Sequence, residues 1–312
     1  MKKTNYFKTI DVFKCNCQIN YRLSIIPNFE SCILFDRLYY TDGKIELYKN
    51  PEELFGYFQN AIQQKRIDIS LFDESMIFHI VKNNKYLFGL YETAKLPNNK
   101  FPHNVNNHNT IMAYGYEQDN IFAYCNTSLN GSERILLPAN QVKEIICYNL
   151  SLTQNGSENE LLGYPLSTLD VISNPPKNSL EDIIKGLERL YFPKNKTCNL
   201  NVLNNIYNSN MRDFRNFEYS GCQYQCATNL RTIKDLFVYQ NMIFKANSCF
   251  LDSVFETNNA IINHMTNIIS LYAKYIFTLK PVFIDRCLLH IEQILALIKK
   301  NELLVNKARK AE

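Results

Sequence analysis

The sequence predicts an α+β fold in which a first part mixes helices with antiparallel strands and a second part is entirely helical. Up to about residue 152, short runs are rich in the β-branched and aromatic residues typical of strands. Beyond about residue 160, apolar residues recur three and four positions apart, which indicates amphipathic helices. The segment between them, "TQNGSENE" (153–160), is polar and has the composition of a linker. We therefore expect a first domain over 1–152 and a helical domain over 160–312.

Composition narrows the class of protein. The chain has 312 residues, of which 46% are hydrophobic and 21% charged, so it can bury a sizeable core. A net charge of +4 without a basic stripe argues against a nucleic-acid partner. The first residues, "MKKTNYFKTIDVF", lack the apolar centre of a secretory signal, and no apolar run is long enough to span a membrane. Ten cysteines in such a chain favour reduced thiols and hence the cytoplasm.

The elements of the first part are predicted from local patterns. The stretch "FKCNCQINYRLSII" (13–26) reads as a helix whose buried face is Ile19, Leu23 and Ile26. Strands are expected over 86–93, 109–117, 120–126 and 144–152. The polar "EQDN" (117–120) has the right length for the turn of a hairpin, and "PANQVKEI" reads as a brief helix before the fourth strand.

Four helices are predicted in the second part. The first, "KNSLEDIIKGLERLYF" (177–192), has an Asn/Ser cap and acidic residues in its first turn. The same period continues over 229–251, 259–277 and 281–305, and the last of these opens with a proline.

Three residue types in the first part point to nucleophilic catalysis. His108 stands at the start of one predicted strand and Asn126 at the end of the next, so a hairpin brings them to the same open end. An Asn beside an imidazole fixes its tautomer and orientation, as a general base requires. The nucleophile would be a thiol at the start of the N-terminal helix, where the helix dipole favours the thiolate. Cys17 is the first choice and Cys15 the alternative.

Other readings of these residues stay open. Both N-terminal cysteines could be small buried residues, as free cysteines usually are. His103 is a rival base five residues before His108, and Cys125 is expected to face the core on the side opposite to Asn126. An oxyanion hole would use the backbone N–H of the nucleophile, with Asn16 or Gln18 as a candidate second donor.

Metal ligation is the last chemistry that the cysteines suggest. Cys222 and Cys226 have a tolerable spacing for one half of a zinc site, but no second knuckle is evident. No bound metal or cofactor is therefore expected.

The order Cys, His, Asn is that of papain-like enzymes, and the chain resembles the papain-fold family typified by butirosin biosynthesis protein H, related to bacteriocin-leader cysteine peptidases. The resemblance lies in "NCQINYRLSII", "YLFGLYETAKLPNN", "HNTIMAYGYEQDNIFAYCN" and "TLDVISNPPKNSLEDIIKGL". It spans nearly the whole chain and is densest over 86–126. The family has "GYD" where this chain has "GYE", and an Asp where it has Asn126; Asn also serves in papain-type triads.

The resemblance implies a papain-like cysteine peptidase fold and amide-forming acyl transfer in antibiotic or other secondary-metabolite biosynthesis. The acyl group would come from the phosphopantetheine arm of an acyl or peptidyl carrier protein and pass through the cysteine as a thioester to a small amine. A closthioamide-type amide synthetase, which uses carrier-bound β-alanine, looks similar in layout. The helical domain would then cover the active site and keep water out.

Two other functions are compatible with the same residues. A cysteine peptidase or amidohydrolase would run the same first step and let water resolve the acyl-enzyme. A catalytically inactive binding module would keep the fold for packing alone.

Overall fold

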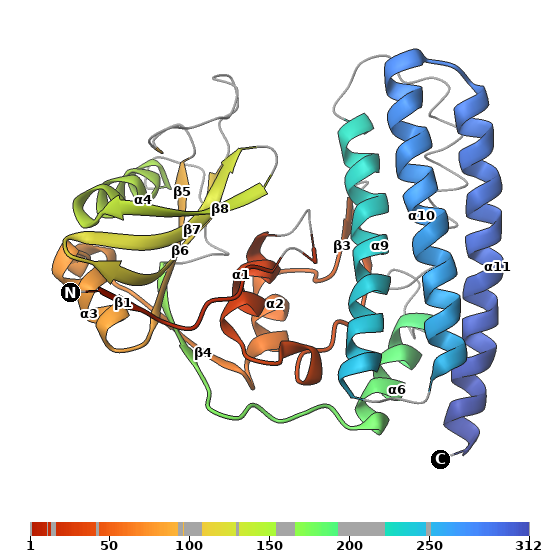
Figure 1. Cartoon of the computed structure of the whole chain (residues 1–312), viewed down its shortest axis with the longest axis horizontal. Coiled ribbons are helices and arrows are strands. Elements are labelled where there is room, and N and C mark those ends of the chain that lie inside the picture. Colours follow the sequence, from red (N-terminus) through yellow and green to blue (C-terminus); the bar gives the residue numbers. More distant parts are fainter. Residues whose placement is uncertain are drawn as a thin grey trace. The chain divides into compact units, whose positions relative to one another are not determined.

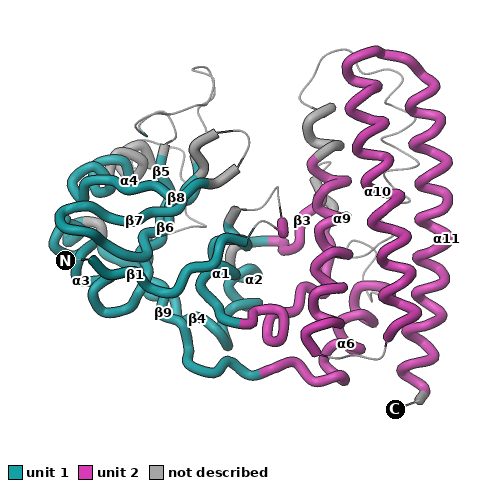
Figure 2. Tube along the Cα trace, in the orientation of Figure 1, with its two compact units in different colours: residues 1–11, 16–27, 50–176 teal, residues 12–15, 28–49, 177–312 magenta. Residues whose placement is uncertain are grey.

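The computed structural model describes residues 2–10, 12–13, 17–41, 44–92, 96, 108–128, 131–153, 166–192, 222–247 and 251–311. The chain forms two compact units (Figure 2): unit 1 comprises 1–11, 16–27 and 50–176, and unit 2 comprises 12–15, 28–49 and 177–312. The prediction of mixed helix and antiparallel sheet with a helical C-terminal region is confirmed. Beyond Thr153, the predicted linker 153–160 lies outside the described residues. Within the described ranges, no helix is both long and apolar enough to cross a membrane.

A seven-stranded antiparallel sheet organises unit 1 (Figure 1). Its strands run in the order β4-β9-β5-β6-β7-β8, with β1 pairing to the end of β6. Their bounds are β1 Lys2–Thr4, β4 Ile62–Arg66, β5 Tyr86–Glu92, β6 His108–Glu117, β7 Asn120–Ser128, β8 Gly131–Pro138 and β9 Ser167–Val171.

The β6–β7 hairpin matches the prediction. Glu117 pairs with Asn120, which leaves a two-residue turn in which Gln118 has a positive φ of 54°. Where β1 pairs with β6, residue 115 of β6 must be a glycine, because a Cβ there would lie 2.5 Å from the carbonyl oxygen of Lys3.

Helices α3 (Glu74–Lys82) and α4 (Ala139–Thr153) cover one face of the sheet. The shared core contains residues of both helices and alternate residues of the strands, among them Ile77, Ile80, Leu87, Tyr91, Ile111, Ala113, Ile121, Ala123, Val142, Ile145 and Ile146.

The prediction of a strand over 144–152 was wrong, because that run is the second half of α4. Val142, Ile145 and Ile146 are buried, which is the spacing of a helix face. Four strands of this sheet, β1, β4, β8 and β9, were not predicted.

On the opposite face of the sheet lies α1 (Cys17–Ile25), with α2 (Pro51–Phe58) also in unit 1. Tyr21 of α1 meets Tyr124 of β7 with ring centroids 4.9 Å apart. The predicted buried residues Ile19, Leu23 and Ile26 are all at most 1% exposed.

Unit 2 is built on four helices: α6 (Leu180–Tyr191), α9 (Cys222–Ala246), α10 (Asp252–Thr278) and α11 (Val282–Ala311). A short hairpin of β2 (Tyr39–Thr41) and β3 (Lys44–Glu46) belongs to the same unit. The predicted helices over 177–192, 229–251, 259–277 and 281–305 are present, although α9 starts and ends earlier than predicted, α10 starts earlier and α11 ends later.

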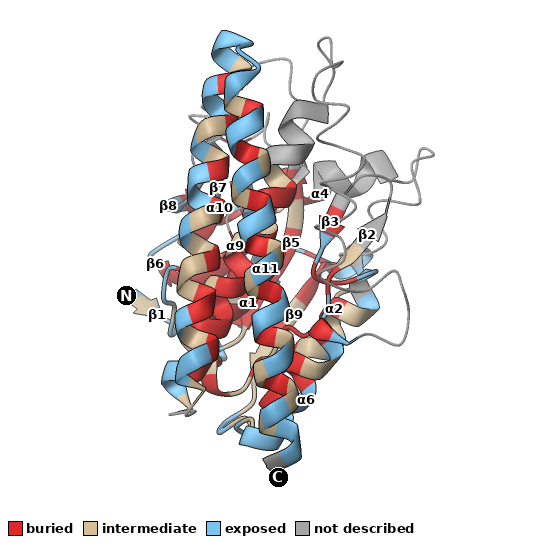
Figure 3. Cartoon of the chain, turned by 90° about the vertical axis from the view of Figure 1, so that its right-hand side faces the viewer, coloured by how far each residue is buried: buried red, intermediate tan, exposed pale blue. Residues whose placement is uncertain are grey.

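The long helices have a heptad pattern. Buried residues of α10 recur at 254, 258, 261, 265, 268, 272 and 275, with Thr257 buried beside them, and those of α11 at 284, 287, 291, 294, 298, 301 and 305. This alternation of three and four residues is the a/d pattern of a coiled coil. Figure 3 shows the result as buried and exposed residues alternating along α10 and α11.

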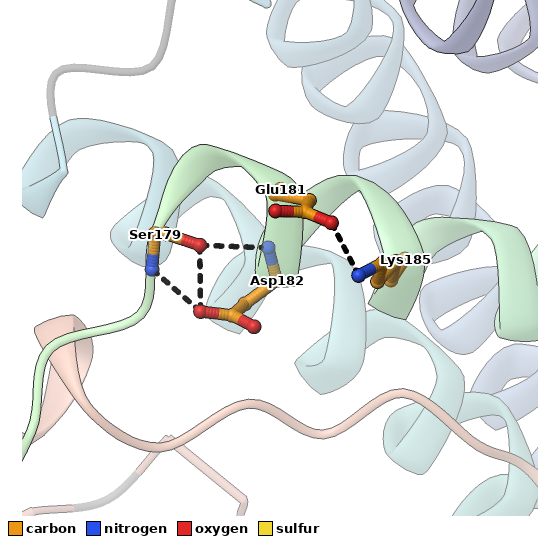
Figure 4. Close-up of polar contacts among 4 residues, drawn as sticks. All are labelled: Ser179, Glu181, Asp182 and Lys185. Atoms are coloured by element: carbon orange, nitrogen blue, oxygen red, sulfur yellow. Dashed lines mark hydrogen bonds and ion pairs between the residues drawn. The ribbon is translucent and has the colours of Figure 1, made fainter. Parts of the chain in front are cut away.

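The predicted cap of the first helix of unit 2 is present (Figure 4). The Ser179 hydroxyl accepts from the Asp182 backbone N–H at 3.1 Å, and the Asp182 carboxylate accepts from the Ser179 backbone N–H at 2.8 Å. One turn on, Lys185 pairs with Glu181. This capping box satisfies two backbone donors that the helix itself leaves unpaired.

Candidate active site

The candidate nucleophile Cys17 is the first residue of α1. Its backbone therefore stands at the positive end of the helix dipole, the position from which the sequence predicted a lowered thiol pKa. The Cys17 side chain and the whole of Cys15 and Asn16 lie outside the described part of the chain. The choice between Cys17 and Cys15 stays a prediction.

A hydrogen bond attaches the start of α1 to the sheet. The side-chain amide of Gln18, the residue after Cys17, donates to the hydroxyl of Thr110 in β6. Thr110 is fully buried and Gln18 nearly so. The backbone of Cys17 is thus held one residue away from a contact near the start of β6, the strand that begins at His108.

The strand register places His108 and Asn126 near the same contact. β6 begins at His108, two residues before Thr110, and β7 carries Asn126 directly after Cys125, which pairs with Ile111. One further step of this antiparallel register sets Asn126 across from Thr110. His108 and Asn126 then occupy diagonal positions, whose separation is about 7–8 Å between neighbouring strands.

Strand alternation assigns both positions to one face of the sheet. Residues two apart on a strand share a face, so His108 belongs to the face of Thr110, and Asn126 to the face of Tyr124. This is the face that α1 covers, since Thr110 bonds to Gln18 and Tyr124 contacts Tyr21. The backbone therefore brings the positions 17, 108 and 126 to one end of α1. The side chains of all three lie outside the description.

A buried arginine extends the anchor of α1. Arg22, one turn after Gln18, donates to the backbone oxygen and the side-chain oxygen of Gln18, both at 3.0 Å. It also donates to Gln64 of β4 at 3.3 Å, and Gln64 donates to Ser167 of β9 at 3.1 Å. The guanidinium centre lies 4.4 Å from the centre of the Phe88 ring.

This chain of contacts, Thr110–Gln18–Arg22–Gln64–Ser167, ties the helix to three strands; we call it the α1 anchor. Sequence reasoning missed it. The available signal was an arginine inside an otherwise apolar helix pattern, since arginine is almost never fully buried without partners.

The anchor also bears on the oxyanion hole. One N–H of the Gln18 amide is already committed to Thr110, and its oxygen accepts from Arg22. An amide nitrogen has two N–H donors, so one remains for any further role. Asn16, the other candidate donor, lies outside the described residues.

Thiols elsewhere in the described chain have raised pKa values. Burial raises the pKa of Cys125 and of Cys287 to about 12, and burial with the nearby Glu30 raises that of Cys32 to about 11. Thiols with such pKa values are weak nucleophiles at neutral pH, because the thiolate is the reactive form. Cys125 is fully buried in the core, as predicted. Cys222 and Cys226 have no described side chains.

The other described histidines have contacts of their own. His79 in α3 contacts the Asn83 amide through its Nε2 at 3.1 Å. His264 and His290 contact each other in unit 2. His103, the rival base, is outside the described residues.

Two surface pockets of unit 1 are lined by described residues. One, of about 280 Å³, lies beside the α1 anchor and is lined by residues that include Arg22, Phe55, Phe58, Gln64 and Arg66. The other, of about 370 Å³, lies toward the β6–β7 turn and is lined by residues that include Phe7, Tyr114, Phe122 and Arg134.

Comparison with protein-family profiles gives no match for this chain, and comparison with curated protein sequences gives none either.

Proposed function

We propose that the chain is an amide-forming acyltransferase with a papain-like arrangement, in which Cys17 carries the acyl group, His108 moves the proton and Asn126 orients His108. The observation that supports it most is the attachment of the start of α1 to β6 through Gln18 and Thr110. That contact lies beside the strand positions of both His108 and Asn126.

The reaction has two balanced steps. In the first, the Cys17 thiolate attacks the thioester of an acyl or peptidyl carrier protein. A new C–S bond forms, the bond to the phosphopantetheine sulfur breaks, and that sulfur takes a proton from His108. In the second, an amine attacks the acyl-enzyme, and the C–N bond forms as the bond to Cys17 breaks. The amine's proton passes to His108 and the thiolate is restored.

The start of α1 supports the first step physically. The peptide dipoles of the helix favour a negative sulfur at its first residue. A thioester exchange onto such a thiolate is close to thermoneutral, so little driving force is needed to load the enzyme. The second step succeeds when the amine is held close and water is kept away.

The decisive experiment mixes the protein with an acyl-carrier thioester, with and without candidate amines, and follows the products of both reactions by mass spectrometry. We expect an adduct on Cys17, or on the alternative Cys15, that persists alone and becomes an amide when an amine is added. Release of free acid regardless of amine would favour the peptidase or amidohydrolase. Absence of any adduct would favour the binding module.

Variants locate the residues. Cys17→Ser is expected to abolish the adduct, with Cys32→Ser as the control because the raised pKa of Cys32 makes it a poor nucleophile. If Cys15→Ser abolishes the adduct and Cys17→Ser does not, the nucleophile is Cys15.

His108→Ala is expected to lower turnover by about 10²- to 10⁴-fold, whereas the control His79→Ala should change turnover little. Asn126→Ala should cost less than His108→Ala, because water can partly replace an orienting amide.

A further inference from the structure

His264 of α10 and His290 of α11 form a pair outside the proposed active site. Their Nδ1 atoms are 2.9 Å apart, and their rings are inclined by 53°. Both side chains are half-buried. Two nitrogens at this distance share one hydrogen, so one imidazole donates its Nδ1–H and the other accepts.

The heptad pattern explains where the pair lies. With the recurring buried residues of both helices at a and d, His264 precedes the a residue Met265 and His290 precedes the a residue Ile291, so each occupies a g position. In an antiparallel pair of helices the g positions of one face the g positions of the other. Such flanking positions usually hold ion pairs. Here they hold two imidazoles.

The surroundings leave the pair without a charged partner on α10. No Asp, Glu, Lys or Arg occurs between Glu256 and Lys274. On α11 the nearest charged residues are Arg286 and Glu292, both exposed. The g positions one heptad away are Leu271 and Phe283 on one side, Thr257 and Leu297 on the other.

We propose that this pair is a binding site for a divalent transition-metal ion, held between the two Nδ1 atoms. Neutral imidazole is the common nitrogen ligand of such ions. Binding needs no net loss of protons: the shared hydrogen leaves Nδ1, Nε2 of the same ring takes up a proton from water, and both Nδ1 lone pairs then face the metal. Burial and the neighbouring His290 lower the pKa of His264.

The spacing selects among metals. With metal–nitrogen bonds of about 2.0–2.1 Å, two nitrogens 2.9 Å apart subtend an angle of about 90° at the ion. That angle suits adjacent positions of a square-planar or octahedral ion, whereas a tetrahedral site requires a wider angle. Cu²⁺ and Ni²⁺ are therefore favoured over Zn²⁺.

The site would be open. Among the residues that the structure describes, no group of three or more His, Cys, Asp or Glu side chains could hold a metal. Cys287, one turn before His290, donates its thiol to the Ile268 carbonyl at 3.7 Å, and burial raises its pKa to about 12. Water or a small ligand would fill the remaining coordination positions, and the ion would link α10 to α11.

The test uses the full chain without a histidine tag, freed of metal and with accessible thiols alkylated. Binding of Ni²⁺ is measured by titration calorimetry, and Cu²⁺ is added for electron paramagnetic resonance, whose hyperfine pattern counts bound nitrogens. We expect a one-to-one site with two equivalent nitrogens. His264→Ala and His290→Ala should each weaken Ni²⁺ binding by at least about tenfold and remove the two-nitrogen pattern. His79→Ala, in α3, should leave both unchanged.

Folding of each variant is checked by circular dichroism, and His264→Gln and His290→Gln replace any alanine variant that does not fold. Ni²⁺ should also raise the melting temperature of the wild type, and it should not raise that of the His264 and His290 variants. Equal binding by wild type and both variants, or no binding by the wild type, would overturn the proposal.

Discussion

Each unit of the molecule contains a buried polar network, and the two networks differ in charge. In unit 1 the α1 anchor centres on a guanidinium, Arg22, which is 1% exposed. In unit 2 the network is neutral: Asn258 of α10 donates to Gln240 and Asn241 of α9 at 3.2 Å and accepts from Asn301 of α11 at 2.9 Å. Asn301 also donates to the Tyr191 hydroxyl of α6 at 2.9 Å.

The difference shows two uses of buried polarity. A buried cation needs several acceptors in fixed places, so the α1 anchor holds one helix rigidly against three strands beside the candidate site. Neutral amides at heptad core positions cost less to bury and pair only in one alignment, so the network of unit 2 fixes the register of its helices.

Removing the centre of the charged network should have the largest effect. Arg22→Ala leaves Gln18 and Gln64 without a donor and opens a cavity beside Phe88, so we expect the free energy of unfolding of unit 1 to fall by about 3–4 kcal/mol. Urea unfolding, monitored by hydrogen exchange in peptides of α1 and β6, measures this loss of stability. Arg66→Ala, at an exposed position of β4, is the control and should change stability by less than about 0.5 kcal/mol.

A small effect of Arg22→Ala would mean that the anchor is not what fixes α1. The acyl-enzyme assay sharpens the result. If the anchor positions the start of α1, Thr110→Val should slow acylation more than its loss of stability explains, because it removes the acceptor of the Gln18 amide.

Breaking the neutral network should cost less. Asn258→Ala leaves Gln240, Asn241 and Asn301 with unpaired amide groups in the core of unit 2, and we expect a loss of about 2–3 kcal/mol. Asn267→Ala, exposed on the same helix, is the matched control. The rate of hydrogen exchange in α10 and α11 should rise in Asn258→Ala and not in Asn267→Ala. Equal effects would show that the contacts of Asn258 do not specify the bundle.

These networks also mark what the sequence could and could not predict. Long periodic segments were predictable, so α6, α10 and α11 and the β6–β7 hairpin match. The run 144–152 was not, because a short apolar run fits a strand and a helix equally well until its packing partners are known. The anchor needed the fold itself: Gln18, Gln64, Thr110 and Ser167 are far apart in sequence, and none has a pattern of its own.

The candidate site divides in the same way. The start of α1 at Cys17, the start of β6 at His108 and the place of Asn126 in β7 follow from local patterns. Local sequence patterns could not predict that α1 covers the face on which positions 108 and 126 lie, because a helix can pack on either face of a sheet. The nucleophile, the oxyanion donor and the orientation of the three side chains stay predictions.

The smallest effect is expected at a polar contact on the surface, where neither network is involved. Ser179→Ala removes the hydroxyl that accepts from Asp182 at the start of α6, and leaves that N–H to water. A lost N-cap costs about 1 kcal/mol, since the helix keeps its other contacts. Ser179→Asn should recover most of it, because Asn caps as well as Ser, whereas Ser270→Ala, exposed in the middle of α10, should be neutral or slightly stabilising. The denaturant midpoints of the three variants measure this order of stability, provided that the dependence of the unfolding free energy on denaturant is the same in all three. If Ser179→Ala instead costs as much as Asn258→Ala, the start of α6 contributes to unit 2 beyond its cap, and the division between buried network and surface contact does not hold there.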